Sequence, residues 1–177
     1  DDIPARRWRI LDWDPSIGNL LILGKSAANA LGGIALAGAR CGRTVHVVGP
    51  PELAAVCPAN NLGTVVDLAD IAQLVQLILR LRQPRAEPGD LLIIADLAAT
   101  AAELDRLAHQ AASAFDELLT DARRGQFAVA AAGNGAQTLL TRSFGLRINL
   151  DEEPAITDRR LRQLGTGTAD RHGWLIG

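Results

Sequence analysis

Runs of apolar residues alternate with segments of helical periodicity along most of this chain. Four runs are apolar at almost every position, as is typical of central parallel strands buried on both faces: residues 20–23, 45–48, 90–96 and 127–132. Shorter or weakly alternating runs predict four further strands, at residues 5–13, 64–66, 146–150 and 174–176.

The segments between these strands predict helices. One follows Asp67 or Asp70, either of which can cap it, with apolar residues at helical spacing from Ile71 to Leu81. Ser26 can cap a helix that runs to about residue 39. A longer helical pattern extends from residue 98 to 125 with an interruption near His109, and short pieces are expected at 52–56, after 135 and at 158–164. Strands that alternate with helices predict an α/β sandwich with a mostly parallel sheet.

Composition narrows the class of protein and of partner. The 177 residues are enough for one domain with a sizeable core. With 18 basic and 20 acidic residues the net charge is −2, so no basic field favours nucleic acid and no basic amphipathic stretch favours a membrane surface. The chain has no initiator Met, signal peptide or long apolar segment, and we therefore expect a domain excised from a larger protein and exposed to the cytosol.

The stretch with the strongest functional signal is NLLILGKSAANALGG at residues 19–33. A buried strand stops at Gly24 and turns directly into an Ala-rich helix. In a phosphate-binding loop the same layout carries GxxxxGK[ST], whose N–H groups, Lys and Ser/Thr hold phosphates and Mg²⁺. Counted from Gly24, the second Gly, the Lys and the Ser/Thr positions are Asn29, Ala30 and Leu31. The layout of a nucleotide site is present here without its usual side chains.

The strand at residues 90–96 supplies the second half of such a site. It ends in Asp96, where P-loop enzymes place an acid that holds Mg²⁺ or its water. Hydrolysing enzymes often carry two consecutive acids, and here the first is replaced by Ala95. Asp96 is either a remnant catalytic acid or the N-cap of the next helix.

These motifs, taken in order, resemble the FtsK/SpoIIIE class of RecA-like ATPases. The resemblance covers residues 10–177 and includes the Gly loop followed by VHVVGP, LLIIADL, QFAVAAAG, TRSFGLRINL and DRHGWLIG. Within the class, the chain is most similar to the C-terminal ATPase modules of type VII secretion coupling proteins. The resemblance implies a three-layer P-loop NTPase (RecA-like) sandwich, with residues 1–177 forming one degenerate ATPase domain of a membrane-anchored protein.

The resemblance also assigns residues to the site. Gly24 matches the first loop glycine and Asp96 the water-activating acid, while Ala95 takes the Mg²⁺-binding position. The implied nucleotide-binding positions are Gly24, Lys25, Ser26, Ala28, Asn29, Ala30 and Leu31, with no metal ligand. Loss of the Lys or of the Mg²⁺ positions costs several powers of ten in the rate of ATP hydrolysis. The eroded site also predicts that ATP and Mg²⁺ bind weakly or not at all.

Some modules of this family have lost catalysis and serve docking or regulation. The resemblance therefore implies a docking or regulatory role, with neighbouring ATPase domains and small helical secretion substrates as partners. The alternative is a working ATPase that uses Lys25 and Asp96 in an altered geometry. A dinucleotide-binding Rossmann domain is disfavoured, because GxGxxG does not follow the first strand.

Several side chains have a functional and a structural interpretation. Lys25 can reach a phosphate or remain solvated, and Asn29 can donate to a phosphate or only occupy the first helical turn. Asn134 can be a polar sensor residue or part of a turn. Arg142, Arg147 and Arg171 can act as arginine fingers or lie at the surface. His46 is expected in the core, and Cys41 and Cys57 are expected to be buried thiols.

Overall fold

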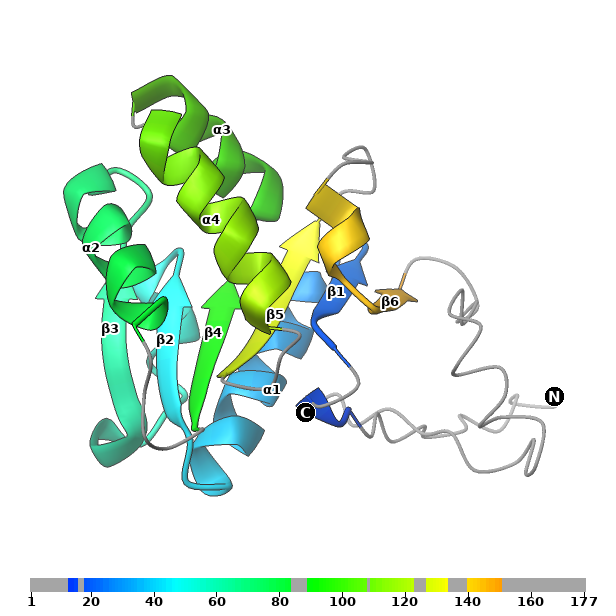
Figure 1. The fold of residues 1–177 in the computed structure, drawn as a ribbon. Helices are drawn as coiled ribbons and strands as arrows, with labels where there is room; N and C mark the ends of the chain where they lie inside the picture. The colour runs from blue at the N-terminus through cyan, green and yellow to red at the C-terminus, as the bar shows by residue number, and fades with distance from the viewer. Residues whose placement is uncertain are drawn as a thin grey trace, which may run out of the picture.

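A six-stranded, all-parallel sheet forms the centre of the protein (Figure 1). The computed structural model describes residues 13–15, 18–83, 89–107, 109–122, 127–133 and 140–150. The strands are β1 (Leu20–Leu23), β2 (Thr44–Val48), β3 (Leu62–Val66), β4 (Asp90–Ile94), β5 (Phe127–Gly133) and β6 (Leu146–Asn149). Their order across the sheet is β3-β2-β4-β5-β1-β6, so β5 lies between β1 and β4.

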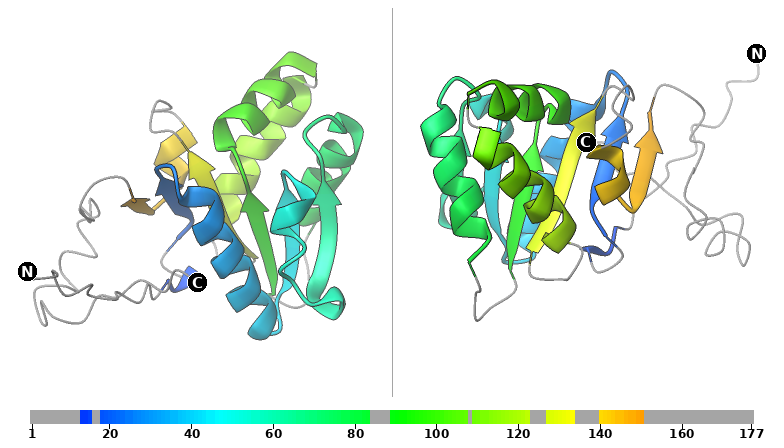
Figure 2. Two further views of the ribbon diagram at one scale, coloured as in Figure 1. Left: turned by 180° about the vertical axis from the view of Figure 1, so that it is seen from behind. Right: turned by 45° about the horizontal axis from the view of Figure 1, so that its top comes forward.

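Helices cover both faces of this sheet and make three layers (Figures 1 and 2). Helix α1 (Ala27–Arg40) packs on one face, and α2 (Ile71–Leu81), α3 (Leu97–Leu107) and α4 (His109–Ala122) pack on the other. Three short 3₁₀ turns complete the described chain: η2 (Pro51–Leu53), η3 (Ala59–Asn61) and η4 (Leu140–Ser143). This confirms the predicted three-layer α/β sandwich. Within the described ranges, no helix is long and apolar enough to cross a membrane.

The core consists of two apolar clusters, one on each face of the sheet. Because successive side chains of a strand point to opposite faces, Leu92 and Ile94 of β4 join the cluster under α2, α3 and α4. Their neighbours Leu91 and Ile93 join the cluster under α1. Strands buried on both faces are apolar at most positions, which explains the nearly continuous apolar runs in the sequence.

Helix α1 is held close to the sheet and ends in a specific backbone motif. A side chain at Gly38 would overlap Leu91 of β4, so glycine permits the close approach. The helix ends at Arg40 with Cys41 as its C-cap, and the next residue, Gly42, has a φ of +80° and donates to the Ala39 carbonyl at 3.0 Å. Arg43 donates to the Gly38 carbonyl, also at 3.0 Å. These two bonds form a Schellman motif, which satisfies carbonyls left open at the helix end.

Asn19 ties the start of β1 to the helical layer. Its side chain is 1% exposed, and Nδ2 donates to the carbonyls of Leu119 at 2.7 Å and Ser143 at 3.0 Å. Both partners lie about a hundred residues or more along the chain, at α4 and η4. A buried amide with these bonds fixes β1, and with it the turn that follows β1, relative to α4.

Several predicted bounds need correction. The strand predicted at residues 90–96 ends at Ile94, since Ala95 and Asp96 turn into α3. The long helical pattern is two helices, which break next to His109 as predicted and pack against each other. Asp70 rather than Asp67 caps α2, accepting from the Gln73 N–H at 3.0 Å. The strands predicted at 5–13 and 174–176 and the helix at 158–164 lie outside the described residues, except Trp13, which is not in a strand.

Candidate functional site

The carboxyl ends of all the parallel strands meet at one edge of the sheet, at the top of Figure 1. In open α/β sheets this is the edge at which ligands bind. Two strand-to-helix junctions carry the predicted site residues: the β1–α1 junction and the β4–α3 junction. Strand β5 separates them, so they lie about two strand spacings, or roughly 10 Å, apart across the edge.

The β1–α1 junction is a tight turn of three residues: Gly24, Lys25 and Ser26. Gly24 has a φ of +108°, a conformation that side chains disfavour, and its carbonyl accepts from the N–H of Ala27 at 3.1 Å. Lys25 and Ser26 are exposed beside the first turn of α1. Ser26 is the N-cap residue as predicted, but its side chain makes no capping hydrogen bond.

The remaining predicted nucleotide positions belong to α1 and not to a loop. Ala28 and Asn29 are exposed in the first turns, and Ala30 is half-buried. Leu31 is fully buried in the core, so its side chain cannot contact a ligand. Because the chain is helical from Ala27, the residues aligned with the open part of GxxxxGK[ST] have no loop to form.

The same turn also allows a second register of the motif. Gly24, Lys25 and Ser26 have the residue types of the last three positions of GxxxxGK[ST], and they directly precede the helix as those positions do. In this register the first glycine position of the motif falls on Asn19, which is buried at the start of β1. The signal was available in the sequence, as a Gly-Lys-Ser triplet at a strand-to-helix turn.

The β4–α3 junction is organised by Asp96. Its carboxylate accepts from the N–H of Ala99 at 2.9 Å, and its carbonyl accepts from the Thr100 N–H at 3.0 Å and the Thr100 hydroxyl at 2.7 Å. Thr100 is completely buried, whereas Asp96 is exposed. Asp96 therefore caps α3, which is the structural one of its two interpretations.

Ala95, at the predicted Mg²⁺ position, is packed against the end of β2. Its N–H donates to the Val48 carbonyl at 2.8 Å, and Gly49 donates to the Val66 carbonyl at 2.9 Å. A side chain at Gly49, which has a φ of +143°, would overlap the Ala95 methyl group. An apolar contact thus occupies this part of the edge.

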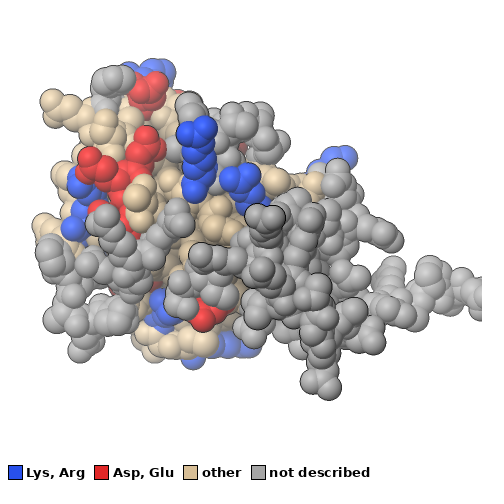
Figure 3. Space-filling model, turned by 45° about the vertical axis from the view of Figure 1, so that its right-hand side comes forward, with Lys and Arg blue, Asp and Glu red and all other residues tan. Residues whose placement is uncertain are grey.

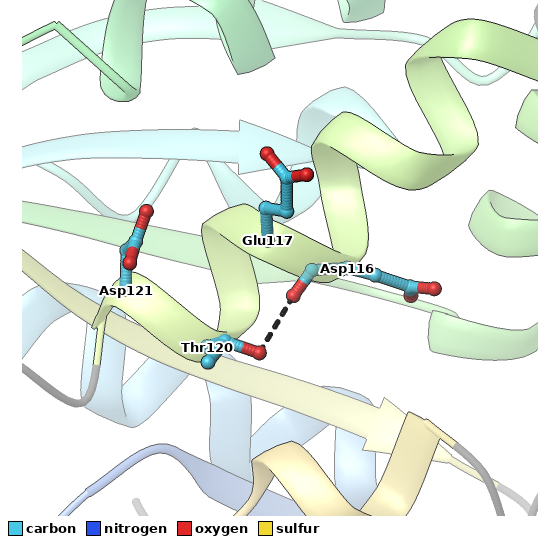
Figure 4. A pocket seen from close by; sticks show the side chains of 4 residues that line it. All are labelled: Asp116, Glu117, Thr120 and Asp121. Carbon is cyan, nitrogen blue, oxygen red and sulfur yellow. Dashed lines mark hydrogen bonds between the residues drawn. The ribbon is translucent and has the colours of Figure 1, made fainter.

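A separate hollow of about 390 Å³ lies on α4, lined by Asp116, Glu117, Thr120 and Asp121 (Figure 4). The Thr120 hydroxyl donates to the Asp116 carbonyl at 2.9 Å. Partial desolvation raises the pKa of the Asp116 carboxyl above its ordinary value. Three carboxylates repel phosphate, so this hollow is unsuited to a nucleotide. Among the described residues, no group of three or more His, Cys, Asp or Glu is placed to hold a metal ion.

Charged side chains of both signs lie next to one another on the side seen in Figure 3. The described residues include two surface ion pairs: Arg82 with Glu117, and Arg106 with Glu103 at 2.7 Å. Among the described residues, this interspersion gives no extended positive field for a nucleic-acid backbone to follow.

The other candidates are dispersed. His46 is fully buried in β2, as predicted, and Arg142 is exposed while Arg147 is half-buried. The prediction of a buried thiol is wrong for Cys41, which is exposed at the end of α1. Cys57 is partly exposed, and burial raises the pKa of its thiol. Asn134 and Arg171 lie outside the described residues.

Comparison with known proteins finds similarity in structure only. No protein family and no curated protein matches the sequence. The structure of EssC (ATPases 2 and 3) from Geobacillus thermodenitrificans is similar with a TM-score of 0.54 at 9% identity, over 78% of this chain. The match spans 33% of that EssC chain, so this chain corresponds to about a third of it. The protein therefore has the RecA-like, three-layer fold of the P-loop ATPases.

Proposed function

We propose that this chain is a degenerate FtsK/SpoIIIE-type nucleotide-binding domain that serves as a docking or regulatory module of a type VII secretion motor. Nucleotide binds at the β1–α1 junction, weakly, and is hydrolysed slowly or not at all. The partners are neighbouring ATPase domains of the same chain or hexamer and small helical secretion substrates. The domain faces the cytoplasm as part of a membrane-anchored protein.

One observation carries the nucleotide-binding part of this proposal: Gly24, Lys25 and Ser26 form the turn that leads directly into α1. The N-terminus of a helix favours an anion, since its first N–H groups point outward and the helix dipole is positive there. Lys25 adds a cation and Ser26 a hydroxyl at the same turn, and both are exposed. The chemistry suits the terminal phosphates of a nucleoside triphosphate.

The residues at the β4–α3 junction support the proposal that ATP is hydrolysed slowly or not at all. Phosphoryl transfer depends on positioning and on charge stabilisation by Mg²⁺ and an acid. At the β4–α3 junction an alanine stands at the Mg²⁺ position, and the single acid, Asp96, caps α3 through the Ala99 N–H. The shortened β1–α1 turn also has fewer N–H groups to surround a phosphate than the full loop.

The test is calorimetric titration of the domain with ATP and Mg²⁺, followed by a phosphate-release assay on the same sample. We expect measurable binding and no release above background. Lys25→Ala should weaken binding at least tenfold, since it removes the cation at the phosphates. Arg40→Ala is the matched control, because it removes an exposed cation at the other end of α1 and should leave binding unchanged. Equal losses in both variants, or no heat with the unmodified chain, would reject a nucleotide site at this turn.

The alternative function is a working ATPase of a DNA or protein translocase with a non-standard P-loop. It is favoured by the Gly-Lys-Ser triplet and by the exposed carboxylate of Asp96. Mg²⁺-dependent phosphate release that disappears in Lys25→Ala would support it over the degenerate module.

A further inference from the structure

A buried histidine on the outer strands of the sheet has no part in the proposed nucleotide site. His46 lies in the middle of β2 and is completely buried, and Asp90 at the start of β4 is 7% exposed. Both lie on the face covered by α2, as the alternation of β2 and β4 requires. Polar side chains buried this deeply need specific partners, and these define what His46 does.

The first partner of His46 is the backbone of the edge strand β3. The pairing of β2 with β3 shifts register, from Val45 opposite Leu62 to Val47 opposite Val65. Two residues of β3, Gly63 and Thr64, therefore face the single residue His46. Nδ1 of His46 accepts from the Thr64 N–H at 2.9 Å and so replaces the ladder bond that the bulge removes.

Glycine at position 63 is part of this arrangement. A side chain at Gly63 would lie 2.5 Å from Cε1 and 2.6 Å from Nδ1 of His46. The imidazole thus fills the space that Gly63 leaves, and the two residues fit each other. The bulge is built around the ring of His46.

The bond from Thr64 fixes the tautomer of His46, and the second partner, Asp90, faces the other ring nitrogen. Nε2 of His46 lies 3.5 Å from the Asp90 carboxylate. Because Nδ1 accepts a hydrogen bond, the neutral ring carries its proton on Nε2, toward Asp90. From α2, which packs beside β3, the charged side chain of Arg80 donates to the Thr64 hydroxyl at 3.4 Å.

We propose that His46 makes the attachment of β3 to the sheet sensitive to acid. A second proton on the ring must go to Nδ1, which turns the acceptor for the Thr64 N–H into a donor that faces another donor. Asp90 faces Nε2 and stabilises the resulting imidazolium, so the ring can take up the proton. The consequence is the loss of the hydrogen bond from the Thr64 N–H in β3. Histidine is the side chain whose ordinary pKa lies closest to neutral pH, which makes it the usual residue for such a switch.

The consequence is that the pairing of β3 with β2 weakens on acidification. Among the described strands, β3 is the outermost on its side of the sheet. When it loosens, the N–H and C=O groups of β2 become available for pairing with another strand. The carboxyl-edge junctions at β1 and β4 are unaffected, since β2 and β4 remain paired along their full length.

The test is amide hydrogen exchange of the whole chain at pH 7.5 and pH 5.5, expressed as protection factors so that the intrinsic pH dependence is removed. We expect the protection of Thr64 to fall at least tenfold at the lower pH, while that of Ala130 in β5 stays constant. His46→Asn is the matched control, because the Asn carbonyl oxygen can take the place of Nδ1 but does not titrate. Constant protection in the unmodified chain, or an equal fall in His46→Asn, would overturn the proposal.

Two further measurements keep the proposal testable if His46→Asn does not fold. The ¹⁵N shifts of the His46 ring at pH 7.5 should show a bare Nδ1 and a protonated Nε2, and the opposite tautomer would refute the mechanism. Asp90→Asn removes the charge that stabilises the imidazolium and should move the loss of Thr64 protection to lower pH. An unchanged midpoint would mean that Asp90 has no such role.

Discussion

The two strand-to-helix junctions at the carboxyl edge solve the same geometric problem with different chemistry. At the β1–α1 junction Ser26 precedes the helix without a side-chain capping bond, and its neighbour Lys25 is exposed. At the β4–α3 junction Asp96 caps the helix and the preceding Ala95 packs on Gly49. The first junction leaves its polar groups at the surface, whereas the second uses its polar and apolar groups for the fold.

This difference separates residues that a ligand can use from residues that stability requires. A helix start that is not capped by its own side chain leaves N–H groups for an anion. A capped start has already satisfied one of these donors. We therefore expect substitutions at the β4–α3 junction to change the free energy of unfolding, and substitutions at the β1–α1 junction to change binding with little effect on stability.

The largest loss of stability is expected from Gly49→Ala, which tests whether the β4–α3 junction depends on the close contact between Gly49 and Ala95. Alanine at position 49 would have a disfavoured φ of +143°, and its methyl group would overlap that of Ala95. Backbone strain and overpacking together should lower the free energy of unfolding by about 2–4 kcal/mol. Urea denaturation followed by circular dichroism measures this loss.

The control for this substitution is Gly33→Ala in α1. Gly33 is exposed, and no atom outside the neighbouring backbone of α1 lies within 4 Å of the position its Cβ would take. The helix should gain about 0.5–1 kcal/mol, because alanine is the better helix former. If both variants lose stability equally, close packing at Gly49 is not the cause.

The next effect concerns the role of Asp96. Asp96→Ala removes the capping bond to the Ala99 N–H and should cost about 1 kcal/mol, whereas Asp96→Asn keeps a capping oxygen and should cost a few tenths. The same urea titrations compare the two. Neither substitution should alter phosphate release if the acid is only a cap. Release that is present in the unmodified chain and lost in Asp96→Asn would instead make the carboxylate catalytic.

The fold was predictable because its signal is repeated along the chain. Four short runs of apolar residues bounded by turn residues are typical of strands buried on both faces, and the helix over residues 71–81 follows from one amphipathic pattern. The order of strands across the sheet was not predictable. It depends on contacts between distant segments, such as the bonds from Asn19 to Leu119 and Ser143.

The site was only partly predictable, for a reason visible at the β1–α1 turn. Gly24, Lys25 and Ser26 were identified as candidate residues, but the register of the motif depends on where α1 begins. A helix start is set within a turn by local hydrogen bonds, here from Ala27 to the Gly24 carbonyl, and a sequence pattern locates it only to within a few residues. The His46 bulge was beyond reach as well, since it needs Gly63 and Thr64 from another strand.

The smallest effect on stability, and the sharpest test of the comparison, is expected from Ser26→Ala. The Ser26 side chain makes no capping bond, so its loss should change the free energy of unfolding by less than about 0.5 kcal/mol. Asp96→Ala, at the equivalent place before α3, should cost about twice that or more. If the first junction binds a nucleotide, Ser26→Ala should nevertheless weaken the binding of ATP with Mg²⁺ in calorimetry, because the hydroxyl is the group that approaches the metal. A variant that loses stability but binds ATP as before would mean that the two junctions do not differ, and that Ser26 is a cap like Asp96.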